Sequence, residues 1–179
     1  ATTAILQDEW YDTRQVKTYL FNPSKPGSEP KVIFDRNYQD VYSDPGDFET
    51  DKNKFGKYVL AIHNNQLYLV GAGYTPKGQF PFVDAFSLKT LKTSRLYQSS
   101  YTDKMEEIFS IEDYKKGEIL VRIQSKNEYP NYYFRTMGKK NALTKLTDFA
   151  NPFASIKDVY KELIKYKRAD GVELSGTLY

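Results

Sequence analysis

The sequence predicts an all-β protein built from repeated units of four short antiparallel strands. Short runs of alternating apolar and polar residues are separated by turn residues, and the pattern recurs about every 50 residues. The 16 Tyr and 11 Phe among 179 residues favour this class, because large flat side chains pack well on a pleated, half-buried surface. The chain is also long enough to bury a sizeable core.

The first unit contains three predicted strands. The first two flank Asp12-Thr13-Arg14, and the third follows the Pro- and Gly-rich loop Pro23–Pro30. The unit lacks one strand, so we expect it to be the interrupted start of a longer array. Its strands are predicted over Ala4–Tyr11, Gln15–Asn22 and Lys31–Asp35.

The second and third units each contain four predicted strands. Asn64-Asn65 predicts a two-residue hairpin turn, because Asn tolerates positive φ. In both units the first strand is the most apolar, as expected of an inner strand, and the last is short and charged, as expected of an outer edge. The strands are predicted over Lys57–His63, Gln66–Ala72, Phe82–Leu88 and Thr93–Gln98, and over Glu106–Glu112, Glu118–Gln124, Asn131–Met137 and Ala142–Phe149.

Four antiparallel strands at this period are typical of the blades of a β-propeller. We therefore predict about three blades of an incomplete propeller, over residues 1–47, 48–100 and 101–152, followed by a β-hairpin tail. A β-sandwich with regular short strands is the alternative. In the tail, Asp170-Gly171 favours a hairpin between Glu162–Arg168 and Val172–Tyr179, although a helical period over 159–167 also fits.

Composition excludes several classes of function. The net charge of +3 is spread along the chain, which argues against a phosphate-binding patch and nucleic-acid partners. The absence of Cys excludes disulfides and thiolate metal sites. No apolar run is long enough to span a bilayer. The compartment is not fixed; a periplasmic or secreted bacterial protein is our working expectation, and no signal segment lies in this chain.

The chain contains no recognisable catalytic apparatus. It has no G-x-S-x-G motif, and His63 is its sole imidazole, so no Ser–His–Asp triad can be built. Neighbouring acids such as Glu106-Glu107 are predicted to be solvated edges, because adjacent strand residues point to opposite faces. Asp40, Asp44 and Asp47 lack the spacing of a calcium loop. We expect no catalytic residue, no metal and no cofactor.

Three stretches and the tail resemble one known family. DEWYDTRQVKTYLFNP (8–23), FDRNYQDVYSDPG (34–46) and GAGYTPKGQFPFVDAF (71–86) resemble the β-propeller of prolyl oligopeptidase-family serine peptidases, nearest to the glutamyl endopeptidase-like branch of bacteria and plant plastids. Residues 146–179 are similar to that family's passage into the α/β-hydrolase domain. The resemblance implies that residues 153–179 are a linker and the first hairpin of a truncated hydrolase domain.

The resemblance implies that this segment is a non-catalytic cap that restricts substrate access, rather than a catalytic domain. The partners it implies are the missing hydrolase domain, upstream blades and a peptide substrate; exposed blade faces further predict a dimer. If the parent prefers acidic side chains, a basic group must meet them, and Arg36 is the candidate, with an ion pair to Asp40 or Asp44 as its structural alternative. The alternative function is a stand-alone propeller-like binding or scaffold module.

Overall fold

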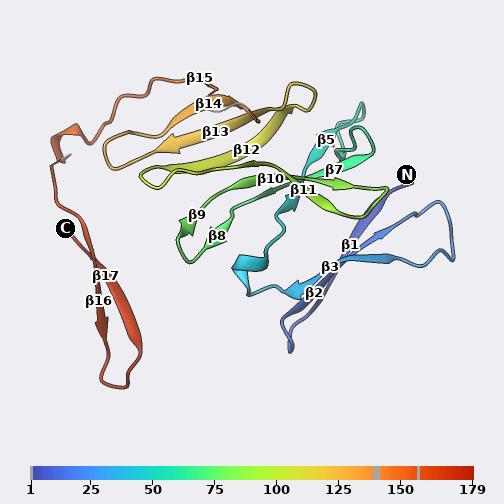
Figure 1. Cartoon of the computed structure of the whole chain (residues 1–179), viewed down its shortest axis with the longest axis horizontal. Helices are drawn as coiled ribbons and strands as arrows, with labels where there is room; N and C mark the ends of the chain where they lie inside the picture. Colours follow the sequence, from blue (N-terminus) through green and yellow to red (C-terminus); the bar gives the residue numbers. More distant parts are fainter. Residues whose placement is uncertain (1, 139–141, 157) are drawn as a thin grey trace.

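The chain folds into small antiparallel sheets (Figure 1). The computed structural model describes residues 2–138, 142–156 and 158–179. These residues form 17 strands and two short 3₁₀ turns, so the all-β prediction is confirmed. None of the helical segments in the described ranges is long and apolar enough to cross a membrane.

The first sheet has three strands in the order β1-β2-β3. A tight turn joins β1 to β2, and Arg14 in that turn has a φ of 58°. Leu6 lies opposite Tyr19 and Tyr19 opposite Val32, so one face of this sheet carries an apolar row. The strands are β1 (Ala4–Trp10), β2 (Gln15–Phe21) and β3 (Lys31–Asn37).

The second sheet has the order β4-β7-β10-β11. Both neighbours of β7 pair with it in antiparallel register, with Phe82 opposite Gly71 on one side and Phe48 opposite Leu69 on the other. The strands are β4 (Asp47–Phe48), β7 (Gln66–Gly71), β10 (Phe82–Ser87) and β11 (Thr93–Gln98).

The prediction for the first strand of this unit is wrong. Within Lys57–His63, the strand β6 (Tyr58–Leu60) pairs with β5 (Thr50–Lys52) in a separate hairpin, and only His63 bridges to Gln66. The two-residue strand β4 takes the place beside β7, because Phe48 packs into the core while Tyr58 and Val59 are exposed. The predicted turn is confirmed, since Asn64 and Asn65 have φ values of 52° and 59°.

The third sheet has the order β12-β13-β14-β15. Its last strand is shorter than predicted, because only Leu143–Lys145 pairs with β14. Residues 139–141 of the expected turn before it lie outside the described residues. The strands are β12 (Met105–Asp113), β13 (Glu118–Gln124), β14 (Asn131–Thr136) and β15 (Leu143–Lys145).

The core lies between the sheets, and the second sheet is covered on both faces. Leu67, Leu69 and Phe86 pack against apolar residues of the first sheet. Tyr68 and Val83 belong to a second cluster with isoleucines of β12 and β13. This alternation follows from the pleat, which sends successive side chains to opposite faces. The three sheets thus form an open stack rather than a closed ring (Figure 1).

The tail is a separate hairpin that extends away from the stack (Figure 1). After the 3₁₀ turn η2 (Ala154–Ile156), β16 (Glu162–Lys167) pairs with β17 (Glu173–Leu178) around Asp170-Gly171. The helical alternative for this segment is therefore wrong. All of β16 is exposed.

Several connections gather at the end of the stack from which the chain leaves for this tail (Figure 1). They include the 3₁₀ turn η1 (Val41–Ser43), the small hairpin of β8 (Tyr74–Thr75) and β9 (Gly78–Gln79), and the β13–β14 loop. The hairpin β5–β6 lies toward the opposite end. We call the end of the stack from which the chain leaves for the tail the exit end.

Candidate substrate-contacting site

Arg36 lies near the end of β3, where the chain leaves the first sheet for η1. Its Nη2 lies 3.3 Å from Oδ2 of Asp44, and its Nη1 donates to the carbonyl oxygens of Asn37 and Asp40, at 3.4 Å each. The side chain is 20% exposed. The structure therefore shows the ion pair expected as the structural alternative, and Arg36 orders this connection. Its role toward a substrate remains a prediction.

The carboxylates of the two aspartates near Arg36 accept hydrogen bonds from backbone amides. Oδ1 of Asp40 accepts a hydrogen bond from the amide of Tyr42, and Oδ1 of Asp44 accepts one from the amide of Gly46. Each of these contacts tightens the turn in which the residue lies. Within the described ranges, no group of three or more His, Cys, Asp or Glu residues is arranged to hold a metal ion.

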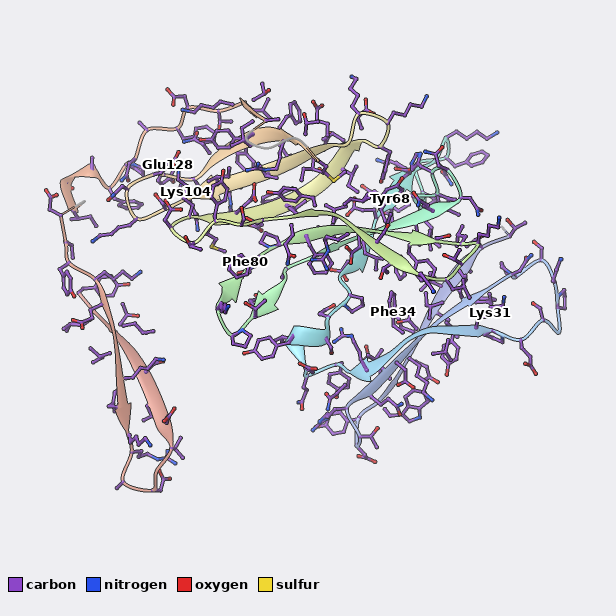
Figure 2. All side chains as sticks on the ribbon, in the orientation of Figure 1. Lys31, Phe34, Tyr68, Phe80, Lys104 and Glu128 are labelled. Atoms are coloured by element: carbon purple, nitrogen blue, oxygen red, sulfur yellow. The ribbon has the colours of Figure 1, made fainter. Side chains whose placement is uncertain are left out.

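A groove of about 310 Å³ lies beside this connection, between the first and second sheets. Asp44 and Tyr42 line it from the connection, and Phe34 lines it from β3. Figure 2 shows Phe34 between the two sheets, where its ring centroid lies 5.9 Å from that of Phe86. The groove can therefore accept an apolar or aromatic group against its walls.

One ion pair lines the same groove from the second sheet. Nε of Arg95 donates to Oδ1 of Asp84 at 2.5 Å, and Nη2 lies 3.3 Å from Oδ2. The guanidinium also lies over the ring of Phe82, 3.9 Å from its centroid. The planar guanidinium group is held both by the carboxylate and by the aromatic ring, so this ion pair gives the groove one well-ordered polar wall.

His63 joins the second sheet to the third. Its Nε2 lies 2.8 Å from Oδ2 of Asp51, and its ring stacks on that of Tyr114 with centroids 3.9 Å apart. Burial raises the pKa of nearby Glu49, and the negative charges of Asp51 and other acids add to that shift. The partners of His63 are thus a carboxylate and aromatic rings, which fits an interface contact.

A buried polar network also connects these two sheets, and the sequence did not reveal it. Glu106 was expected to be a solvated edge residue, but its side chain is fully buried. It accepts hydrogen bonds from Nε of Arg135 at 2.7 Å and from the hydroxyl of Tyr97 at 2.5 Å. Burial and the bond to Glu106 raise the pKa of Tyr97 far above its ordinary value. A sequence signal for this burial was present, because Glu106 and Ile108 lie two residues apart on one strand and therefore share a face, and Ile108 is buried.

Comparison with known proteins gives a relationship for nearly the whole chain. No family model matches the sequence. It is 35% identical over 189 aligned positions to a probable chloroplastic glutamyl endopeptidase of Oryza sativa subsp. japonica, covering 98% of this chain. It is 32% identical over 192 positions to the protein of that name in Arabidopsis thaliana, covering 99% of this chain. In both cases the chain spans 20% of the relative's length.

Proposed function

We propose that this chain is the non-catalytic, β-propeller part of a serine peptidase of the prolyl oligopeptidase family, acting as a cap that gates peptide substrates. The observation that carries the proposal is the similarity of nearly the whole chain to one fifth of two relatives named as glutamyl endopeptidases. The stack of antiparallel sheets, each packed face to face with the next, also supports it, because propeller blades pack in this way.

In this proposal the three sheets correspond to blades over about residues 1–47, 48–100 and 101–152, and residues 153–179 lead into the catalytic domain. The exposed hairpin β16–β17 is consistent with that assignment, because a two-stranded hairpin is marginally stable in water unless other strands or helices cover it. Nucleophile, base and oxyanion site would all lie beyond Tyr179, and this chain would restrict access to them.

The proposal is tested by comparing this chain with the longer protein that contains it. We expect the longer protein to hydrolyse short peptides and to spare folded proteins, and this chain alone to hydrolyse neither. Turnover by the purified chain would contradict the proposal. A longer protein that binds peptides without hydrolysing them would instead support a binding or scaffold module.

Arg36 is proposed to meet acidic side chains of the substrate. A guanidinium binds a carboxylate through two parallel hydrogen bonds, and Arg36 would exchange or share its contact with Asp44 to do so. In the longer protein, Arg36→Ala should lower kcat/KM for a Glu-containing peptide by roughly tenfold or more relative to a neutral peptide, which is the worth of one charge-assisted hydrogen bond.

Arg168→Ala is the matched control, because Arg168 is also an arginine paired with an aspartate but lies in the turn of the hairpin β16–β17, away from the groove. It should change both peptides alike. An unchanged preference in the Arg36→Ala variant would remove Arg36 from substrate recognition without touching the proposed role of the whole chain.

A further inference from the structure

Lysines that are spread along the sequence meet at the end of the stack opposite the exit end. The β5–β6 hairpin, the β10–β11 turn and the β12–β13 turn all lie there (Figure 1). We call the surface formed by their exposed lysines the lysine end; it consists of Lys52, Lys54, Lys57, Lys89, Lys92, Lys115 and Lys116. The even spread of charge along the sequence argued against such a patch, so folding creates it.

Contacts between these connections hold the lysines on one surface. The amide of Leu88 donates to the carbonyl oxygen of Asn65 at 3.1 Å, which joins the β10–β11 turn to the turn before β7. In that same turn, Nε2 of His63 lies 2.8 Å from Oδ2 of Asp51 in β5. The ring of His63 also stacks on Tyr114 of the β12–β13 turn. The three connections are therefore neighbours, and their lysines act together.

Two of the carboxylates next to these lysines are already engaged. Asp51 is paired with His63. Oδ1 of Asp113 accepts hydrogen bonds from the amides of Lys115 and Lys116 at 2.9 Å each, and its Oδ2 lies 3.4 Å from Nζ of Lys116. Within the described residues, Lys116 is the one member of the lysine end that pairs with a carboxylate. The other lysines therefore present their charge to solvent.

The β5–β6 hairpin places aromatic rings among these charges. Phe55 is 75% exposed and Tyr58 72%. The turn has a defined shape, because Oδ1 of Asn53 accepts hydrogen bonds from the amides of Phe55 and Lys57 at 2.9 and 3.0 Å. Nζ of Lys54 lies 5.0 Å from the centroid of the Phe55 ring. The tip of the hairpin is thus an exposed apolar group with cations on both sides of it.

A membrane surface with anionic headgroups fits both parts of this pattern. Clustered lysines are attracted to anionic lipids, and exposed aromatic side chains enter the boundary between headgroups and acyl chains. A lysine stem can lie along that apolar boundary while its ammonium group stays among the headgroups. Nucleic acid fits less well, because none of the three connections contains an arginine, the side chain best suited to paired hydrogen bonds with phosphates.

We propose that the lysine end binds reversibly to the surface of an anionic lipid membrane, with Phe55 inserted at the level of the headgroups. The inference goes beyond the proposed function and does not depend on it, since it concerns the end of the stack opposite the exit end. The contact is peripheral, because three turns supply it and no spanning segment takes part. Salt should weaken it, because exposed charges are screened.

Sedimentation with lipid vesicles tests the proposal. We expect this chain, and the longer protein that contains it, to bind vesicles of equimolar phosphatidylcholine and phosphatidylglycerol but not vesicles of phosphatidylcholine alone. Replacing both Lys54 and Lys57 by Gln should weaken binding about twentyfold or more, since each lysine near an anionic surface contributes about fivefold. Phe55→Ser should weaken it by about tenfold, because the inserted ring is lost.

Replacing both Lys77 and Lys126 by Gln is the matched control, because it also removes two exposed lysines, but from the β8–β9 turn and the β13–β14 loop at the exit end. This control should leave vesicle binding unchanged. Equal losses in the two double variants would overturn the proposal, because binding would then follow total charge rather than the lysine end.

Three further outcomes would also overturn the proposal. Equal binding to phosphatidylcholine alone would assign the interaction to apolar sheet faces. Binding by this chain but not by the longer protein would mean that another segment covers the lysine end. Binding of a single-stranded oligonucleotide without binding of anionic vesicles would identify nucleic acid as the partner.

Discussion

At the residue scale, the contacts that join the second and third sheets are polar as well as apolar. The pair of Glu106 and Arg135 is buried, and the hydroxyls of Tyr97 and Tyr101 complete its hydrogen bonds. Breaking a buried pair by removing one partner leaves a charge without compensation, whereas exposed pairs contribute little. The stability lost when one partner of an ion pair is truncated should therefore depend much more on how buried the pair is than on the distance between its charged atoms.

Arg135→Ala should lower the free energy of unfolding by about 3–5 kcal/mol, because the Glu106 carboxylate would remain buried without its cation. Urea unfolding followed by circular dichroism measures this. Arg168→Ala is the control, since Arg168 makes an exposed pair with Asp170 and its loss should change stability little. Equal effects of the two substitutions would contradict the network's role.

Glu49 should make stability depend on pH. Its pKa is raised mainly by burial, so the folded state holds the proton more tightly than the unfolded state does. Stability from this group is then fully present below the unfolded pKa and is lost as pH rises through the folded pKa. Glu49→Gln should therefore be more stable than the original chain at neutral pH, and the difference should shrink as the pH falls to about 4.

Denaturant unfolding of the original chain and of Glu49→Gln, from neutral pH down to about pH 4, measures this difference in stability. Glu29→Gln, in the exposed loop before β3, controls for the loss of one negative charge. A stability gain from Glu49→Gln that is larger at acidic than at neutral pH would show that burial of the carboxylate is not the cause.

At the element scale, the β8–β9 hairpin depends on close backbone packing. Gly46, Gly71 and Gly73 each lie where an added Cβ would come within 2.5 Å of a neighbouring atom. Gly73 has in addition a φ of +64°, which side chains other than glycine's rarely adopt. The base of the hairpin is therefore closely packed, since Gly73 before β8 and Phe80 after β9 face each other and the amide of Phe80 donates to the carbonyl oxygen of Gly73 at 2.9 Å.

Gly73→Ala should destabilise the chain by more than Gly27→Ala does. Both glycines have positive φ, but nothing lies within 4 Å of a Cβ at Gly27. Gly27→Ala thus carries only the left-handed strain of about 1–2 kcal/mol, and Gly73→Ala adds a clash with the backbone of Phe80. Thermal unfolding measures both variants, and similar losses would mean that the β8–β9 hairpin moves freely.

The sequence predicted elements well where a period extends over a whole strand. In β13, buried Ile119, Val121 and Ile123 alternate with less buried residues, and that run was recognisable. β4 was missed because two residues are too short to show a period. Tyr58 and Val59 misled the assignment because they are apolar but exposed, and pairing with β5 rather than burial defines their strand.

The candidate site was less predictable than the strands. The positions of Arg36, Asp40 and Asp44 were enough to suggest an ion pair with one of the two aspartates, and the structure shows that the partner is Asp44. The groove beside Arg36 could not be inferred, because Phe34, Tyr74 and Arg95 come from three separate strands and line one groove only when the sheets stack.

At the scale of the whole molecule, an open stack leaves two sheet faces that no sheet of the described residues covers. The first sheet presents the row of Leu6, Tyr19 and Val32. The third presents Phe109 and Tyr132, whose ring centroids lie 5.5 Å apart. Apolar faces of this kind are covered in the interior of the stack, where Leu67 and Tyr68 occupy the two faces of the second sheet.

We predict that the isolated chain self-associates through these faces, because contiguous exposed apolar surface favours association. Sedimentation velocity over a range of concentrations should show a dimer that Phe109→Lys weakens. Phe55→Lys, at an exposed turn away from either face, should leave it unchanged. A chain that stays monomeric at high concentration would count against an interrupted array of sheets.

The central claim is that this chain caps a catalytic centre that it does not itself contain. A fluorophosphonate probe, which reacts with activated serine nucleophiles, tests it most directly when the modified residue is mapped by mass spectrometry in the longer protein. The account predicts a single modified serine beyond Tyr179, and no modification of residues 1–179 either there or in the isolated chain. A labelled serine within residues 1–179, or a longer protein that the probe leaves unmodified, would contradict it.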